Sequence, residues 1–262
     1  MAAPRKPTDD SLMKTAVVFA AIMLAATPAF AQSGPYAARN QWSFELTPYL
    51  WAAGLQGDVE VRNRKASVDA SFSDLLKDLN FGAMLAAEVR YDRWGFLFDG
   101  MYMKLSEGGD TPGALSSGVD VVSKTGIVEG AFMYRPVWLD GFTLDVLAGA
   151  RAWILDAELK FKPGLLPGAT ISRTIAFADP IVGFRAVVNV TDRLLLSVLG
   201  DVGGFGVSSD ITWQAFGGIE YRFATHWSAR AGYRALGIDI DKRDAHINAV
   251  LHGPVLGLSW RF

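Results

Sequence analysis

Apolar and polar residues alternate along several segments of the chain with a period of two, which indicates β-strands with two different faces. In the segment ITWQAFGGIEYRF (211–223) the odd-numbered positions are apolar or glycine, whereas the other face carries Glu220 and Arg222. The segments NFGAMLAAEVRYD (80–92) and PIVGFRAVVNV (180–190) alternate in the same way. In each of them one face is apolar, and the other mixes small residues with isolated charges.

The pattern predicts about ten strands, near residues 42–52, 80–92, 94–106, 121–135, 141–161, 171–190, 194–206, 210–223, 227–240 and 246–262. Most have the length of a tilted strand that crosses a bilayer, about 9–11 residues. Short links such as DRWG, TDR and ATH alternate with mostly longer ones such as 53–79 and 107–120. Short turns at one end and longer loops at the other are typical of bacterial outer-membrane barrels.

Two all-β folds compete for this pattern. A β-sandwich also alternates, but its polar face meets water and usually carries Lys, Thr and Ser. Here the polar face holds Gly, Ala, Asn, Glu and Arg with almost no lysine, which suits a crowded lumen. We therefore predict a closed antiparallel up-and-down transmembrane β-barrel of about ten strands, with eight or twelve strands as alternatives.

Aromatic residues gather near the predicted strand ends. The set next to the short turns is Trp42, Tyr91, Trp94, Phe96, Tyr134, Trp138, Phe142, Tyr221, Phe223, Trp227, Trp260 and Phe262. A smaller set near the opposite ends is Trp51, Tyr102, Phe161 and Trp213. Two aromatic belts are what the two interfaces of a bilayer favour.

The beginning of the chain predicts export. From Met13 it reads MKTAVVFAAIMLAATPAFAQ, with Lys14 before a short apolar run and small residues at Ala29 and Ala31. This is the pattern of a signal peptide, so we expect residues 1–31 to be cleaved and residues 32–262 to form the barrel domain. The residues before Met13 suit a signal peptide poorly, and we expect them to come from an upstream start codon or to be a dispensable extension.

Composition narrows the class further. Hydrophobic residues make up 50% of the chain, and mean hydropathy is +0.20. Three of the 25 basic and two of the 27 acidic residues leave with residues 1–31, so 22 basic and 25 acidic residues remain. This balance argues against a nucleic-acid partner. The absence of cysteine excludes disulfides, thiolate metal sites and thiol catalysis.

The chain ends in GPVLGLSWRF, in which Gly257, Trp260 and Phe262 stand six, three and one positions from the end when the last residue is counted as one. This arrangement resembles the C-terminal assembly signal of Gram-negative outer-membrane barrels, although Val255 stands where a polar residue is usual. By pattern the mature chain resembles the OmpA transmembrane domain. WSFELTPYLWAAGLQG, GDVGGFGVSSDITWQ and GYRALGIDI also resemble a group of proteobacterial outer-membrane barrels without assigned activity.

The resemblance implies an outer-membrane location. It also implies outer-membrane lipids and lipopolysaccharide as surroundings, and the barrel assembly machinery and periplasmic chaperones as partners during biogenesis. The oligomeric state stays open.

Charged residues at the inward phase of the strands are nearly balanced between acids and arginines. They are Glu45, Glu88, Asp99, Glu129, Asp145, Asp201, Glu220, Arg90, Arg151, Arg185, Arg222, Arg230 and Arg234. Hairpin turns at Thr225–His226 and Arg93–Trp94 would place Glu220 opposite Arg230 and Glu88 opposite Asp99. Buried charges are tolerated when they are paired, so we predict a charge network that fills a narrow lumen.

The segment RKASVDASFSDLLKDL (64–79) departs from the barrel pattern. Ser71 or Ser73 could cap a short helix near 73–79 with Leu75, Leu76 and Leu79 on one side. A helical turn in an external loop is the favoured interpretation, and a lid or plug over the lumen is the alternative.

Evidence for catalysis is slight. His226 and Ser228 resemble the His-x-Ser of lipid A deacylases, but the match covers three residues in a turn on the periplasmic side, and no acid follows at a matching spacing. We assign no catalytic, cofactor or metal site. The sequence predicts a barrel with a structural or surface-interaction role. A narrow channel for ions or small solutes is the alternative, and a lipid A-modifying hydrolase is a minor one.

Overall fold

The structure is a computed structural model that describes residues 40–61, 64–109, 119–162, 168–242 and 245–262. The predicted signal peptide, residues 1–31, lies outside the described residues. Within them, no helix is long and apolar enough to cross a membrane.

Ten strands form a closed wall, in which each strand pairs antiparallel with its neighbours. They are β1 (Trp42–Trp51), β4 (Leu79–Tyr91), β5 (Trp94–Gly109), β6 (Val119–Leu139), β7 (Phe142–Phe161), β8 (Ala169–Asn189), β9 (Leu194–Gly204), β10 (Ile211–Arg222), β11 (Trp227–Lys242) and β12 (Ala245–Arg261). The wall closes where β1 meets β12, with Leu46 opposite Trp260. The predicted ten-stranded antiparallel barrel is therefore confirmed, and we call the end with turns β4–β5, β6–β7, β8–β9 and β10–β11 the short-turn end.

The segment predicted as a long loop, 53–79, contains three further elements. They are β2 (Gly54–Val61), β3 (Arg64–Ala70) and the helix α2 (Phe72–Asp78). β1 and β2 pair with successive halves of β12, and the chain breaks its strand geometry between them at Ala52–Ala53. β3 then pairs with β2, so the β2–β3 hairpin extends the wall beyond the barrel.

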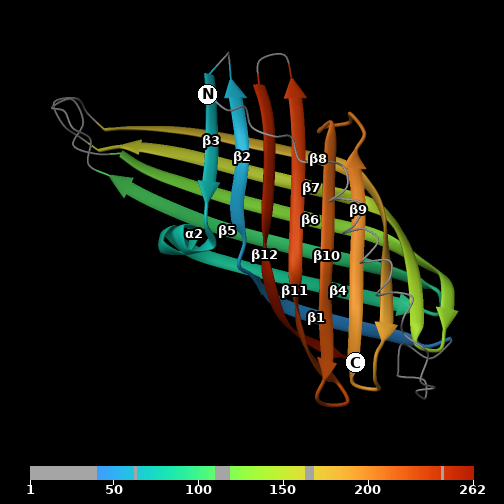
Figure 1. Cartoon of the computed structure of the whole chain (residues 1–262). Coiled ribbons are helices and arrows are strands. Elements are labelled where there is room, and N and C mark those ends of the chain that lie inside the picture. The colour runs from blue at the N-terminus through green and yellow to red at the C-terminus, as the bar shows by residue number, and fades with distance from the viewer. Residues whose placement is uncertain (1–39, 62–63, 110–118, 163–167, 243–244) are drawn as a thin grey trace, which may run out of the picture.

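The helix α2 has the predicted cap. Ser71 Oγ accepts a hydrogen bond from the backbone N–H of Asp74 at 3.3 Å and donates one to the Asp74 carboxylate at 2.5 Å. This hydrogen bond and the neighbouring Lys77 hold the pKa of Asp74 below its ordinary value. The helix contacts β2 and β5, and Figure 1 shows it beside the end of β3 at the edge of the wall.

Three strands are much longer than a bilayer requires. β6, β7 and β8 have 21, 20 and 21 residues, against about 9–11 for a crossing strand. Their far halves continue past the barrel at the end opposite the short turns. Figure 1 shows them diverging there from the β2–β3 hairpin and β12.

The outer surface of the wall is apolar, with aromatic rings at the short-turn end. Trp94 and Tyr134 lie with ring centroids 4.7 Å apart, and Trp260 and Phe262 lie 4.6 Å apart. Trp42 and Trp94 expose 64% and 63% of their surface. The rings thus form the predicted belt at this end.

Two tryptophans assigned to the belts make contacts with the interior of the barrel. Trp51 is buried inside the barrel, and Trp138 packs on the guanidinium of the buried Arg135, which lies 5.3 Å from its ring centre. Trp51 alternates with the exposed Leu50, so its inward phase follows from the strand. The side chain of Phe161 lies outside the described residues.

Candidate functional site

The lumen is the candidate site, because the exposed outer face of the wall is largely apolar. Every charged residue assigned to the lumen has the inward phase of its strand; Arg222, for example, lies between the exposed Tyr221 and Phe223. The structure divides these residues among four clusters of ion pairs.

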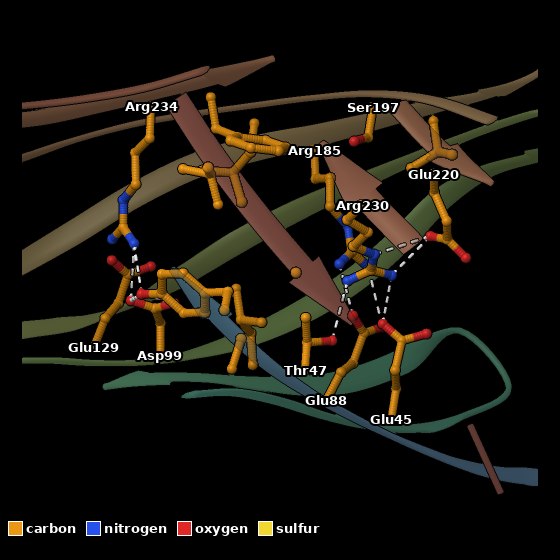
Figure 2. A pocket seen from close by; sticks show the side chains of 18 of the residues that line it. Glu45, Thr47, Glu88, Asp99, Glu129, Arg185, Ser197, Glu220, Arg230 and Arg234 are labelled. Carbon is orange, nitrogen blue, oxygen red and sulfur yellow. Dashed lines mark hydrogen bonds and ion pairs between the residues drawn. The ribbon is translucent and has the colours of Figure 1, made fainter. Parts of the chain in front are cut away.

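The first cluster lies at the short-turn end. Arg230 Nη2 lies 2.5 Å from Glu45 and 2.8 Å from Glu220, and Figure 2 shows its guanidinium between the two carboxylates. Arg261 bonds Glu45 as well and lies 3.5 Å from Glu220, while Arg222 lies 3.7 Å from Glu220. Glu220 stands opposite Arg230 in the ladder, as predicted from the turn.

The second cluster joins strands on different sides of the barrel. Arg185, from β8, bonds Glu88 at 2.6 Å and Asp145 at 2.9 Å. Arg90 and Arg135 also bond Asp145, at 3.0 Å and 2.7 Å, so three guanidinium groups surround one buried carboxylate. Arrangements of this kind combine charge with directional hydrogen bonds, which makes them strong and geometrically specific.

The predicted opposition of Glu88 and Asp99 is wrong. Leu97 stands opposite Glu88, and Ala86 stands opposite Asp99. The turn falls at Asp92–Arg93, with Asp92 at a positive φ of 50°, and Tyr91 pairs with Trp94. This one-residue difference in the turn moves Asp99 two positions along the ladder from Glu88.

The third cluster centres on Arg151. Its Nη2 lies 2.7 Å from Glu129 and 2.8 Å from Asp201, and its Nη1 donates to Thr212 at 3.3 Å. Gln214 donates to Asp201 at 3.0 Å. Arg151, Glu129 and Asp201 have side chains that are at most 1% exposed, so water contributes almost nothing to their solvation.

The fourth cluster adds an aromatic face. Arg234 bonds Asp99 at 3.1 Å and the Tyr49 hydroxyl at 2.9 Å, and the hydroxyl donates to Asp99 at 3.0 Å. The same guanidinium lies 4.9 Å from the centre of the Trp51 ring, a cation–π distance. This cluster therefore marks the boundary between the charged layer and an apolar one.

Several members of the network were not among the predicted lumen residues. Arg135 and Arg261 bind lumen acids, and Tyr49, Thr212 and Gln214 complete hydrogen bonds. The signal was present: Arg135 has the same strand phase as Glu129, and Arg261 follows Gly257 and Ser259 at the inward phase.

Beyond the charges, the lumen is apolar. Trp51, Met101, Ile127, Trp153, Leu236 and Ile238 form one buried layer at the end opposite the short turns. A cavity of about 180 Å³ lies among the charged residues nearer the short turns, lined in part by Glu45, Asp99 and Arg234 (Figure 2). The predicted charge-filled lumen is thus charged in one half only.

The histidine of the His-x-Ser pair contacts the backbone of the last strand. His226 is exposed at the short-turn end, and its Nδ1 lies 2.9 Å from the carbonyl oxygen of Arg261. In the part of the chain that the structure describes, no group of three acidic or histidine side chains could hold a metal ion. The geometry supports charge neutralisation and packing in the lumen.

A closed wall with an apolar outer face, an aromatic belt and charges inside is the design of a bilayer-spanning barrel. The fold is that of an outer-membrane β-barrel. The chain matches no protein-family model and no curated protein.

Several solved structures are similar. Ail, the attachment invasion locus protein of Yersinia pestis, in complex with the heparin analogue sucrose octasulfate, is 15% identical, with 84% of this chain and 98% of that chain covered and a TM-score of 0.34. Neisserial surface protein A is 13% identical, with 84% and 97% covered and a TM-score of 0.32. The toluene transporter TodX of P. putida is 11% identical, with 86% and 90% covered and a TM-score of 0.34.

Proposed function

We propose that the mature chain is an integral protein of a Gram-negative outer membrane with a sealed lumen, and that it acts through its surface without catalysis. The apolar wall, its aromatic belt and the predicted signal peptide support this location. Outer-membrane lipids and lipopolysaccharide would surround it, and the barrel assembly machinery and periplasmic chaperones would assist its insertion.

The filling of the lumen carries the proposal of a sealed barrel. Arg151, Glu129 and Asp201 form buried ion pairs inside the lumen that join strands β6, β7 and β9. Above them Trp51 and Trp153, each 4% exposed, belong to a contiguous apolar layer. A barrel of about this size is just filled by side chains, and a hydrated path would need both layers to open.

The strands beyond the barrel support a surface role. The far part of β8, from Ala169 to Ala176, is exposed at every residue, and β8 pairs with β9 only from Ile181 onward. β7 nevertheless pairs with β8 as far as Phe161 and Ala169, so the extension is an ordered sheet. An ordered sheet held outside the bilayer offers a surface to other cells, to lipopolysaccharide or to a host.

Conductance of the refolded chain in planar bilayers tests the proposal. We expect no current steps above those of a detergent blank, while a faster gel migration of unboiled protein shows that the barrel has folded. Discrete, reproducible steps from folded protein would overturn the sealed lumen. They would favour the narrow channel, for which the cavity of about 180 Å³ is the supporting observation.

A further inference from the structure

The barrel wall has a seam between β1 and β4. Their ladder ends at Pro48 opposite Leu85, and the remainder of β4, toward Leu79, pairs with β5 alone among the described residues. β1 meanwhile continues into β2, which pairs with β12 and β3. The wall therefore divides beyond Pro48, and Figure 1 shows β3 and β5 running in different directions beside α2.

An apolar pocket of about 290 Å³ lies at this seam. No charged side chain lines it, and its lining residues come from both the outer and the inner face of the wall. Leu50 and Leu256 come from the outer face, where they are 73% and 62% exposed, whereas Trp51 and Met101 come from the buried apolar layer. The helix α2 contributes Leu75. The pocket thus runs from the lipid-facing surface toward the interior.

The pocket lies within the height of the hydrocarbon. Trp42 stands in the aromatic belt of the short-turn end, and Leu50 stands eight residues farther along the same strand. At about 3.4 Å per residue and a tilt of about 40°, Leu50 is roughly 20 Å above the belt. The apolar band of such barrels is about 25 Å tall. The mouth of the pocket therefore faces the leaflet opposite the short turns, which is the outer one on the proposed topology.

The size of the pocket suits a hydrocarbon chain. An apolar cavity of about 150 Å³ can hold benzene, so about 290 Å³ corresponds to roughly a dozen carbon atoms. An unfilled apolar cavity costs stability because its lining loses dispersion contacts, and an acyl chain from the adjoining leaflet would restore them.

We infer that the seam binds one hydrocarbon chain, supplied by a lipid of the outer leaflet, which enters sideways from the bilayer past Leu50, where the β1–β4 ladder has ended. The chain lies against Trp51 and Met101, and Leu75 of α2 covers it. This site needs no conduction through the lumen, so it goes beyond the proposed surface role and can fail independently of it.

The test uses lipids with brominated acyl chains, because bromine quenches tryptophan fluorescence on contact. The protein is reconstituted in vesicles of brominated or ordinary phosphatidylcholine, and the contribution of Trp51 is the difference between the wild type and Trp51→Phe. We expect bromine to quench at least half of this contribution. Trp153, equally buried but absent from the lining of the pocket, is the control through Trp153→Phe, and its contribution stays unquenched.

A filling variant makes the test specific. Gly82 lines the pocket, and a Cβ there would meet Leu79 at an ordinary 3.8 Å, so the backbone has room for a side chain and Gly82→Leu adds one at the pocket lining. We expect Gly82→Leu to abolish the quenching of Trp51. Gly217→Leu adds the same side chain in open space and leaves the quenching intact. Gel mobility of unboiled protein shows that each variant is folded.

A second arm identifies the source of the chain. Free brominated fatty acid is added to the protein in ordinary vesicles, and quenching that requires this addition, with none from brominated lipid, overturns a lipid source. Equal quenching of Trp51 and Trp153 by brominated lipid, or quenching that survives in Gly82→Leu, overturns the site itself.

Discussion

The two halves of the lumen are filled by different interactions, ion pairs in one and apolar packing in the other. Near the short turns, Arg151, Arg185 and Arg230 each hold two carboxylates from other strands, so each of these ion pairs has a fixed direction and distance. In the other half, residues such as Ile127 and Trp153 pack without direction. The ion pairs of the charged half therefore determine which strands are held together. The apolar half, which packs without directional contacts, can tolerate an irregularity such as the divided wall at β1 and β4.

The largest effect is expected in the charged half. Arg151→Met leaves Glu129 and Asp201 buried without their shared cation, and breaking a buried pair in this way costs about 3–5 kcal/mol. The measurement is urea unfolding of the protein in lipid vesicles, followed by gel mobility of unboiled samples. Lys160→Met, which removes a pair 3.6 Å from Glu158 with a half-exposed lysine, is the control and should cost less than about 1 kcal/mol.

A triple variant separates charge compensation from hydrogen bonding at Arg151. The triple variant Arg151→Met, Glu129→Gln, Asp201→Asn carries no buried charge at this site, so it should regain most of the stability that Arg151→Met loses. If the triple variant is the less stable of the two, the network stabilises by its hydrogen bonds and not by charge compensation.

An intermediate effect is expected at the break between β1 and β2. A Cβ at Gly253 would lie on the carbonyl oxygen of Ala52, so Gly253→Ala forces the backbone of the break away from β12. Overpacking of this kind costs about 1–3 kcal/mol, measured in the same unfolding assay. Gly217→Ala, with nothing within 4 Å of the added carbon, should be neutral. Equal stability of the two variants would contradict a close approach at the break.

The smallest effect is expected at α2. Ser71→Ala removes the hydroxyl that accepts from the Asp74 amide, so we expect about 1 kcal/mol of local destabilisation, seen as faster hydrogen exchange of that amide. The pKa of Asp74 should rise, because the hydrogen bond that lowers it is lost. Ser73→Ala is the control, since the Ser73 hydroxyl contacts only that of Ser71 in the described structure. A shift of the global unfolding midpoint as large as that of Arg151→Met would show that α2 supports the whole barrel.

The wall was predictable from the sequence because strand phase is a local property. Alternation placed Glu220 on the inward face, and a tight turn placed it opposite Arg230. The hairpin β2–β3 was missed although GLQGDVEV alternates too, because eight residues are too few to count as a membrane-crossing strand on length alone.

The partners across the lumen were not predictable in the same way. Glu88 and Arg185 are 97 residues apart in the sequence, and their contact depends on the diameter and stagger of the closed barrel. The apolar layer did have a local signal. Met101, Ile127 and Trp153 are each two positions from a lumen charge on the same strand (Asp99, Glu129 and Arg151, respectively), so they share its inward phase. The charges of the same phase obscured this signal for the apolar layer.

The ladder between β1 and β12 has a consequence for how the protein is made. Glu45 and Arg261, joined there, are 216 positions apart, so closing the ring must bring together parts of the chain that are far apart in sequence. Before that event the growing sheet has two unsatisfied edges, each a template for pairing with the wrong molecule. Closure of the ring therefore competes kinetically with aggregation. A catalyst that shields both edges would determine the yield of folded protein.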